Sequence, residues 1–403
     1  MFTIEGTYAT AICYATVAEE TAIEQIRTMC DTPFTEGSRV RIMPDMHAGV
    51  GCTIGTTMTI RDKVVPNVVG VDIGCGMYVV DLGKDDLDLV RLDAACHSVP
   101  SGREVWPGRR AHFALTELAC FRNLKETRRI ERSIGTLGGG NHFIEIDRSE
   151  DGTNYLVIHS GSRNLGTQVA NYYQHLAVDL HSGMGEYFEE RDRIIAELKA
   201  SGRRSEIQSA LKRLLRHGKR NPDVTPELCW LEGRYMDDYL ADVALCQTYA
   251  RLNRETMAAV ILDAMGLSAG EAFHTIHNYI DVDEMILRKG AIAAHEGELV
   301  IIPLNMRDGS VLARGRGNAE WNFSAPHGAG RVMSRKDAKA TLSLDDYRSQ
   351  MEEAGIYTTC VCEETLDEAP GAYKSREDII APIAEAVDIV DEMRPIYNFK
   401  ATN

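Results

Sequence analysis

The segment Ser324–Arg331 combines residue types that suit phosphate chemistry. Small residues let backbone N–H groups approach a phosphate closely, and an arginine can hold phosphate oxygens with two hydrogen bonds. A histidine beside them can act as a base, a metal ligand or a nucleophile that carries a phosphoryl group. The segment therefore predicts a phosphate pocket, with a purely structural Gly-rich turn as the alternative. The histidine, the three small residues after it and the arginine are His327, Gly328, Ala329, Gly330 and Arg331.

Four further segments place a possible metal ligand beside glycine, asparagine or serine. One carboxylate, one thiol and three imidazoles are enough for one or two transition metals, and by softness alone this set favours zinc. Taken singly, each residue has a structural alternative, because an Asp often caps a turn and a Cys often packs in a core. The sequence thus predicts a metal site if the fold brings the segments together. The candidate ligands are Asp72, Cys75, His142, His159 and His277.

Together, these segments resemble the motifs of the RtcB family of RNA-splicing ligases. The motifs are DIGCGM, GGGNHFIE, HSGSR, HNY and SAPHGAGR, and the similarity extends from Met43 to Lys400, over most of the chain. The resemblance implies one compact catalytic domain, residues 1–403, around a deep metal-containing cleft. It also implies a GTP-dependent RNA ligase that joins a 3′-phosphate or 2′,3′-cyclic phosphate end to a 5′-hydroxyl end, in tRNA splicing or RNA repair.

The resemblance further implies two manganese ions, Mn²⁺, instead of zinc. One ion would be held by Asp72, Cys75 and His142, and the other by Cys75, His159 and His277. A thiolate at Cys75 would bridge the two ions. An archease-like activating protein is a further partner that the resemblance raises.

The covalent chemistry is also implied by the resemblance. His327 would attack the α-phosphate of GTP and carry the guanylate, while Asp45 fixes the tautomer of its ring. The guanylate would pass to the RNA 3′-phosphate to give an RNA–ppG end, and attack by the 5′-hydroxyl would release GMP. The sequence has no Walker A motif, which argues against a P-loop NTPase.

Nucleotide contacts follow from the same resemblance, with one departure from the family pattern. The segment Pro303–Ser310 stands where a PGSMG-like loop is typical, so that Asn305 replaces a nucleotide-contacting serine. This departure keeps two alternatives open: a metal-dependent phosphoesterase and a non-ligating RNA-binding paralog. The implied contacts are Glu145 to guanine; Asn305, Ser310, Tyr373 and Lys400 around the nucleotide; and Asn141, Arg163, Gly328, Ala329 and Gly330 to its phosphates.

Composition places the chain among ordinary globular proteins, with 44% hydrophobic and 26% charged residues. The sequence contains no apolar run of membrane-spanning length and no basic-then-apolar secretory signal, which predicts a cytoplasmic location. Ten cysteines occur without a CxxC pair. We expect reduced, buried thiols with a structural role at every position except Cys75.

Net charge and its distribution point in opposite directions. The formal charge of −16 argues against extensive phosphate contacts, which need Lys and Arg. The segment 186–220 is nevertheless locally basic and is predicted to be a charged helical insertion. It is interpreted either as a solvated helical hairpin or as an RNA-contacting arm. Its basic residues towards the C-terminal end are Arg203, Arg204, Lys212, Arg213, Arg216, Lys219 and Arg220.

Alternating element types without a regular βαβ repeat predict an α+β fold. We expect short strands and turns over residues 1–85, including an apolar strand that leads into the DIGCG turn. The other expectations are a helix over 112–131, a strand over 155–159, mostly helix over 166–264, a strand around 299–302 and a mainly helical segment over 376–394.

Overall fold

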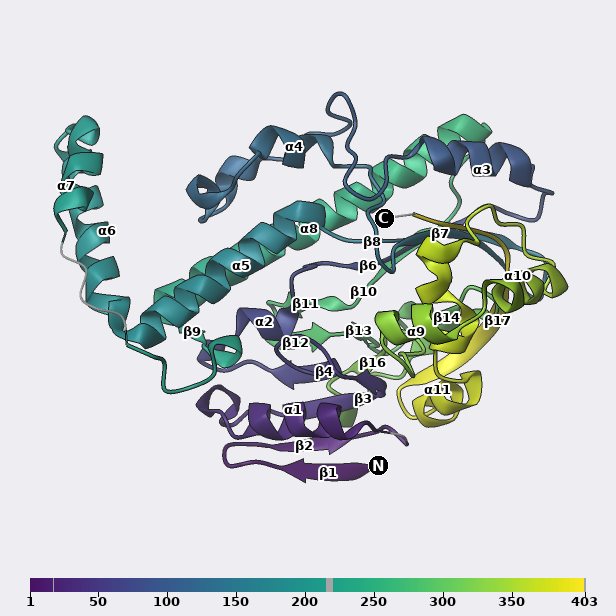
Figure 1. Ribbon diagram of the computed structural model, residues 1–403, viewed down its shortest axis with the longest axis horizontal. Coiled ribbons are helices and arrows are strands. Elements are labelled where there is room, and N and C mark those ends of the chain that lie inside the picture. Colours follow the sequence, from purple (N-terminus) through teal and green to yellow (C-terminus); the bar gives the residue numbers. More distant parts are fainter. Residues whose placement is uncertain (17, 215–219, 402–403) are drawn as a thin grey trace.

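The computed structural model describes residues 1–16, 18–214 and 220–401 (Figure 1). Two β-sheets with mainly antiparallel strands form the framework of these residues. In these residues, the first sheet has the order β1-β2-β3-β4-β12-β11, with β2 and β3 as its parallel pair. Its strands are β1 (Phe2–Glu5), β2 (Thr10–Cys13), β3 (Val40–His47), β4 (Ile54–Thr59), β12 (Ile286–Lys289) and β11 (Asn278–Asp281).

The second sheet has the order β10-β6-β8-β7-β17-β15-β14, and all of its pairs are antiparallel. Its strands are β10 (Ala272–Ile276), β6 (Gly76–Asp81), β8 (Asn154–Ser160), β7 (Phe143–Arg148), β17 (Val387–Lys400), β15 (Gly309–Gly315) and β14 (Leu299–Asn305). Two short ribbons complete the β-structure of the described residues: β13 (Ala291–Ala293) with β16 (Ser324–Pro326), and β5 (Lys63–Val64) with β9 (Leu231–Glu232).

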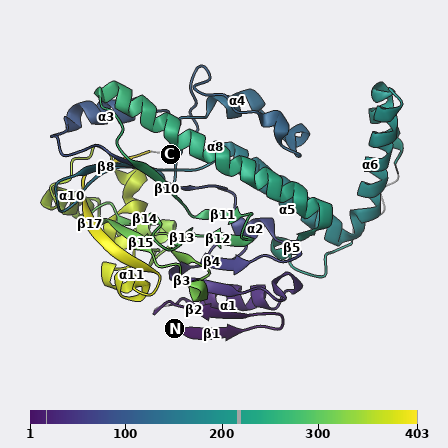
Figure 2. The same cartoon turned by 180° about the vertical axis from the view of Figure 1, so that it is seen from behind.

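Helices cover the sheets, and the long helix α8 (Gly233–Met265) crosses behind the second sheet beside α5 (Arg163–Asp179) (Figures 1 and 2). Helix α8 ends at Gly266, whose φ of 71° suits the left-handed cap that glycine adopts without strain. The largest apolar core joins α1, the first sheet, α5 and α8, as in Ile26, Ile42, Val169 and Val243. The remaining helices are α1 (Glu20–Cys30), α2 (Pro66–Val69), α3 (Leu89–Ser98), α4 (Thr127–Arg132), α6 (Gly185–Ala200), α7 (Ile207–Arg213), α9 (Arg335–Thr341), α10 (Leu344–Glu353) and α11 (Arg376–Ile383).

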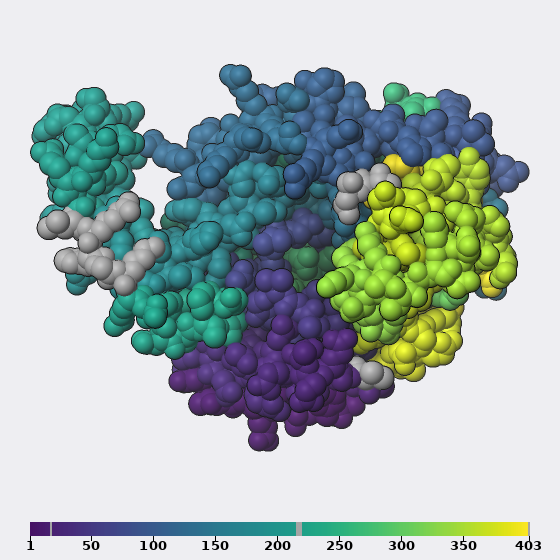
Figure 3. Space-filling view, viewed as in Figure 1, coloured from purple at the N-terminus to yellow at the C-terminus, as the bar shows by residue number. Residues whose placement is uncertain are grey.

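Helices α6 and α7 form an arm, residues 185–213, that stands away from the body of the molecule (Figures 1 and 3). A kink at Gly183, with φ 85°, redirects the chain from α5 into α6. The arm is polar and largely exposed, with Phe188 as its one buried apolar side chain among the described residues. Arg216 and Lys219, which belong to the predicted basic segment, lie outside the described residues. In the helices that the structure describes, none is both long and apolar enough to traverse a lipid bilayer.

The α+β fold class is confirmed, as are the strand over 155–159, the mostly helical region 166–264 and the strand around 299–302. The strand predicted ahead of the DIGCG turn was wrong beyond Val64, because Pro66 at the first helical position starts α2. Residues 1–85 also contain an eleven-residue helix, α1. The helix predicted over 112–131 is reduced to short 3₁₀ turns and α4.

The helix predicted over 376–394 was wrong after Ile383. From Val387 the chain forms β17, which lies between β7 and β15 and pairs with both. Val387, Ile389 and Val390 are β-branched and Asp388 is a weak helix former, so the stretch favours a strand. Val387–Met393 pairs with β15 and Arg394–Lys400 pairs with β7, so each half of β17 has a partner strand for its backbone groups.

Candidate active site

One edge of the second sheet gathers most of the predicted metal ligands. Cys75 directly precedes β6, His142 directly precedes β7, His159 lies near the end of β8, and His277 directly follows β10. The register pairs Gly76 with both Ser160 and Ile276, and Phe143 with His159. Because neighbouring antiparallel strands run in opposite directions, the starts of β6 and β7 meet the ends of β8 and β10. Segments far apart in sequence therefore converge.

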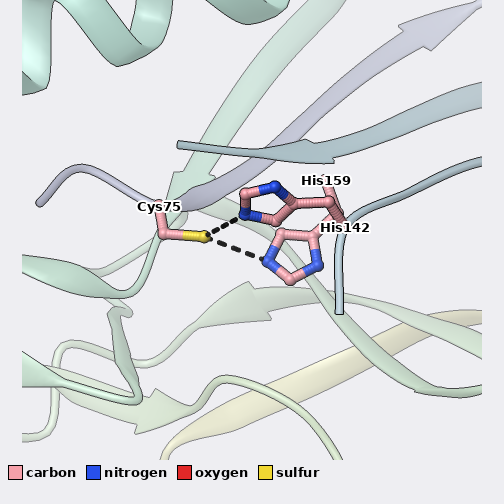
Figure 4. Close-up of side chains that lie close together, drawn as sticks. All are labelled: Cys75, His142 and His159. Carbon is pink, nitrogen blue, oxygen red and sulfur yellow. Dashed lines mark hydrogen bonds between the residues drawn. The ribbon is translucent and has the colours of Figure 1, made fainter. Parts of the chain in front are cut away.

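The ligand atoms themselves lie close together (Figure 4). Cys75 Sγ is 3.5 Å from His142 Nε2 and 3.3 Å from His159 Nε2. His142 Nε2 is 3.0 Å from Asp72 Oδ2, and His159 Nε2 is 3.4 Å from His277 Nε2. The five side chains form a continuous cluster, which we call the metal cluster. Cys75, His142 and His159 form its compact centre.

The protonation of these rings fits metal binding. His142 Nδ1 lies 2.9 Å from the Leu137 carbonyl oxygen, and His159 Nδ1 lies 3.0 Å from that of Asn141. Each ring can thus donate Nδ1–H to a carbonyl and turn the lone pair of Nε2 towards Cys75, which is how a second partner orients a ligating histidine. Burial lowers the pKa of His159 and His277 well below the ordinary value, so both rings are neutral. A carboxylate, a thiol and three imidazoles whose ligand atoms lie this close together fit one or two divalent ions.

Glycine is required where the chain passes this cluster. Gly138 has a φ of 96°, and a Cβ there would lie 2.0 Å from Arg163 Nη1 and 2.5 Å from His142 Nδ1. A side chain at this position would displace a candidate ligand. Packing against Arg163 and the candidate ligand His142 therefore requires glycine at the first position of the GGGNH run.

His327 lies beside this cluster and is held by Asp45. The ring centroids of His327 and His277 are 4.9 Å apart. Asp45 Oδ2 accepts a hydrogen bond from His327 Nδ1 at 2.6 Å and one from the backbone N–H of His327 at 3.1 Å. The Asp45 side chain is fully buried and that of His327 is 18% exposed. The pair therefore places the proton on Nδ1 and leaves the lone pair of Nε2 available.

The loop after His327 has free donors. In the part of the chain that the structure describes, the backbone N–H groups of Gly328, Ala329 and Gly330 donate to no acceptor. Arg331 Nη1 is buried and makes no hydrogen bond among the described residues, and Glu368 Oε1 lies 3.6 Å from it. A Cβ at Gly330, whose φ is 70°, would lie 2.3 Å from the Asp45 carbonyl oxygen, so the loop can pack on the MPDMH strand only with glycine. Such unpaired donors suit an anion.

A cavity of about 270 Å³ opens beside His327, and we call it the nucleotide cavity. Its walls come from β3, β7, β14, the loop 327–331 and the end of β17. The predicted nucleotide residues that line it are Asn141, Glu145, Asn305, Gly328, Ala329, Gly330, Tyr373 and Lys400. Ser310 and Arg163 do not line it. Ser310 is buried on β15, and Arg163 faces a second hollow on the Asp72 side of the metal cluster.

Glu368, which the sequence analysis missed, is the ionic centre of this cavity. Its carboxylate accepts hydrogen bonds from Lys400 Nζ and Tyr373 Oη, each at 2.5 Å, and from Arg335. Burial opposes ionisation, yet the Lys400 ammonium and the Arg335 guanidinium lower the pKa of Glu368 to about 2. Lys400 and Tyr373 are thereby fixed in the cavity wall. Nothing in the motifs signals Glu368, because its partners lie on other segments.

A buried carboxyl pair lies deeper in the same wall. Glu145 accepts a hydrogen bond from the Asn398 amide, its partner across β7 and β17. Asp147 follows two residues later on the same face of β7 and is fully buried. Burial, reinforced by the charge of Asp147, raises the pKa of Glu145 well above its ordinary value. Burial raises the pKa of Asp147 to about 6. Asp147 was also missed by the sequence analysis.

The divergent segment 303–310 comprises the end of β14, the turn 306–308 and the start of β15. Asn305 Oδ1 accepts the backbone N–H groups of Arg307 and Asp308, both at 3.0 Å, and its Nδ2 donates to Asp308 at 2.7 Å. Both ends of the amide are thus engaged within the turn while Asn305 lines the cavity. This asparagine-closed turn replaces the flexibility that glycines would give.

Comparison with known proteins identifies the family to which the chain is related. A family profile described as tRNA-splicing ligase RtcB matches residues 25–127 and 116–401. The chain is 31% identical to the RNA-splicing ligase RtcB of Escherichia coli (strain K12), over 95% of this chain and 94% of that protein. It is 27% identical to RNA-splicing ligase RtcB2 of Escherichia coli (strain ATCC 25922), over 95% and 92% of the two chains. It is 28% identical to the tRNA-splicing ligase RtcB of Aeropyrum pernix, over 88% and 86%. On this evidence, and with its motif residues converging in one site, the chain belongs to the RtcB family.

Proposed function

We propose that this chain is a GTP-dependent RNA ligase that joins a 3′-phosphate or 2′,3′-cyclic phosphate end to a 5′-hydroxyl end through a guanylate on His327. The observation that carries the proposal is the position of His327. Its Nδ1 is engaged by Asp45, and its ring lies between the metal cluster and a cavity with unpaired loop amides. The names of its relatives, RNA-splicing and tRNA-splicing ligases, supply the substrate class.

The first step is nucleotidyl transfer to the protein. His327 Nε2 attacks the α-phosphorus of GTP, an N–P bond forms, and the bond to the β-phosphate bridging oxygen breaks to release pyrophosphate. The ring becomes positively charged while its Nδ1–H continues to donate to Asp45, whose buried carboxylate stabilises that charge. The unpaired N–H groups of Gly328 to Gly330 would donate to phosphate oxygens.

Two divalent ions, which we propose to be Mn²⁺, would be held by Asp72, Cys75, His142, His159 and His277. When bound, they would neutralise the charge of the reacting phosphates and orient the attacking and leaving oxygens. The chain itself contributes neutral imidazoles at His159 and His277 and a carboxylate at Asp72.

RNA enters in the second and third steps. An oxygen of the RNA 3′-phosphate attacks the phosphorus of the guanylate, the N–P bond breaks, and His327 returns to its neutral form. The 5′-hydroxyl of the other RNA end then attacks the former 3′-phosphate, which forms the phosphodiester and expels GMP. A cyclic phosphate end is opened by water before the second step.

Guanine would lie in the nucleotide cavity against Glu145. Its N1–H and N2–H₂ groups need acceptors, and Glu145 offers a carboxyl group that is positioned by Asn398. Tyr373 and Lys400, which Glu368 holds in the wall, would contact the base or ribose. We retain Asn141 and Asn305 as phosphate or ribose contacts because both line the cavity.

End joining tests the proposal directly. Purified protein with Mn²⁺ is given a radiolabelled RNA with a 3′-phosphate and a second RNA with a 5′-hydroxyl, with GTP, with ATP or without nucleotide. We expect a joined product with GTP alone. Joining that ignores nucleotide, or removal of the 3′-phosphate without joining, would replace the ligase by a metal-dependent phosphoesterase.

A further inference from the structure

A second hollow borders the metal cluster on the side of Asp72. It measures about 460 Å³, and we call it the basic hollow. Asp72 belongs both to the metal cluster and to the wall of this hollow, and its side chain is 30% exposed. His159 of the same cluster lines the nucleotide cavity instead. Contacts of 3.0, 3.5 and 3.3 Å link Asp72 to His159 through His142 and Cys75, so the cluster separates the two hollows.

Three arginines line the basic hollow: Arg103, Arg129 and Arg163. Arg163 is fixed by hydrogen bonds to the Gly102 carbonyl oxygen at 2.7 Å and to Thr136 Oγ1 at 3.1 Å. Arg129 donates to the backbone carbonyl of Arg103, which ties the two together. The wall also carries the carboxylates Asp72, Glu104 and Glu126, so the hollow itself is balanced in charge.

The surface around the hollow carries an excess of positive charge. Residues 103–132 contain eight Lys or Arg and four Asp or Glu, a net charge of +4 in a chain whose total is −16. Ion pairs engage Arg109 with Glu131 at 2.6 Å and Arg129 with Glu126 at 3.9 Å. Five exposed basic side chains have no carboxylate within 4.0 Å in the part of the chain that the structure describes: Arg103, Arg110, Arg122, Lys125 and Arg128.

We propose that the basic hollow and the exposed basic residues of segment 103–132 bind the phosphate backbone of the RNA next to its reacting end. The assignment rests on the proposed ligase function. Phosphoryl transfer needs the attacking and leaving oxygens roughly in line on opposite sides of the phosphorus. A nucleotide in the nucleotide cavity occupies one side of the metal cluster, and the basic hollow leaves the other side to RNA.

Exposed, unpaired arginines and lysines suit a polyanion whose sequence varies. In Figure 3 the blue segment that contains α4 forms the upper rim of the hollowed centre of the molecule, whereas the teal arm stands apart. Location therefore favours segment 103–132 over the arm, although residues 186–220 carry the same net charge of +4.

The test compares two double variants that change charge equally. Arg103→Glu with Arg128→Glu alters the proposed RNA surface, and neither side chain has an ion pair in the described residues. Arg204→Glu with Arg213→Glu makes the same change on the arm and serves as the matched control. Fluorescence anisotropy measures binding of a labelled single-stranded RNA with a 3′-phosphate at several salt concentrations. Thermal melting of each variant checks its fold.

We expect the first variant to bind RNA about tenfold more weakly at low salt. Its log–log salt dependence should flatten by about 1.4, since each phosphate contact to a single strand contributes about 0.7. The arm variant should match the wild type. Equal losses in both variants, or a loss below about twofold in the first, would overturn the assignment.

Formation of the GMP adduct, measured with labelled GTP and no RNA, separates this assignment from the proposed function. Both the wild type and the first variant should form the adduct, because this half-reaction needs no RNA. A wild type that forms no adduct while the first variant still loses RNA binding would contradict the ligase and support the RNA surface.

Discussion

The nucleotide cavity and the basic hollow meet at the same metal cluster but are built by opposite means. The cavity is walled by strands, and its ionic groups are already paired, as in the contacts of Glu368 with Lys400 and Tyr373. The hollow is walled by Asp72, the loop 102–105, α4 and the start of α5, and the surface around it carries exposed basic side chains without carboxylate partners in the described residues. A wall whose side chains are held by hydrogen bonds suits one defined nucleotide, whereas exposed charges without ion-pair partners suit a backbone of variable sequence.

His327 lies on the cavity side, and its removal has the largest expected effect. His327→Ala should reduce GMP-adduct formation and RNA joining to the detection limit, because the variant lacks the attacking nitrogen. Thermal melting should stay close to that of the wild type, since the ring is partly exposed. Joining at the wild-type rate with ends that carry no guanylate would remove His327 from the mechanism.

Asp45→Asn tests how strongly formation of the GMP adduct depends on the fixed tautomer of His327. An amide cannot balance the charge that develops on His327, and its NH₂ group can orient the ring wrongly. We expect the rate of adduct formation to fall by about 10²- to 10⁴-fold, as for other histidines that lose an orienting carboxylate. RNA affinity should be unchanged. An unaltered rate would show that the contact of 2.6 Å is structural alone.

Cys75 belongs to the metal cluster, which lies between the nucleotide cavity and the basic hollow, so its substitution should affect both. Cys75→Ser should lower bound manganese, measured by elemental analysis, towards one ion or none, because a hydroxyl is a poor bridging ligand. Cys30→Ser, at another buried thiol in α1, should retain the wild-type metal content. Two ions bound to the Cys75 variant with normal turnover would contradict the bridging role.

Glu368→Gln should damage the cavity wall and spare the basic hollow. It leaves Lys400 buried without its charge partner, which costs about 3 kcal/mol of unfolding free energy. It should also raise the KM for GTP. RNA affinity provides the control, and a parallel loss of RNA binding would mean that the two hollows are not independent.

The same carboxylate predicts a pH dependence of stability. The pKa of Glu368 in the folded protein is about 2, below the ordinary value of 4.5. Its stabilising contribution is therefore fully present above pH 4.5 and is lost as the pH falls towards 2. The difference in melting temperature between the wild type and Glu368→Gln should shrink over this interval. A constant difference would assign the effect to packing.

The motif residues could be predicted from sequence because their chemistry fixes their types. Asp72, Cys75, His142, His159 and His277 were named as ligands from their Gly-rich contexts and from family resemblance, and the structure places them in one cluster. Their roles as ligands remain a proposal. The α+β class was also predictable, since short runs of apolar and β-branched residues such as Leu299–Ile302 favour strands.

Features that depend on distant partners could not be predicted. Glu368 looks like any acidic residue until Lys400, Tyr373 and Arg335 are brought to it by three other segments. The extent of β17 depends on two distant strands: β15 pairs with Val387–Met393, and β7 pairs with Arg394–Lys400. The basic surface of 103–132 was hidden for a similar reason, because a count of charges cannot distinguish it from 186–220.

The proposed mechanism requires that GTP modifies one defined nitrogen, Nε2 of His327, which lies in the nucleotide cavity beside the metal cluster. Incubation with α-labelled GTP and Mn²⁺, without RNA, followed by denaturation, proteolysis and mass spectrometry would locate the label. The account predicts an acid-labile GMP on the peptide that contains His327, and no adduct in His327→Ala. A stable protein that takes up no label, or a label on any other residue, would contradict it.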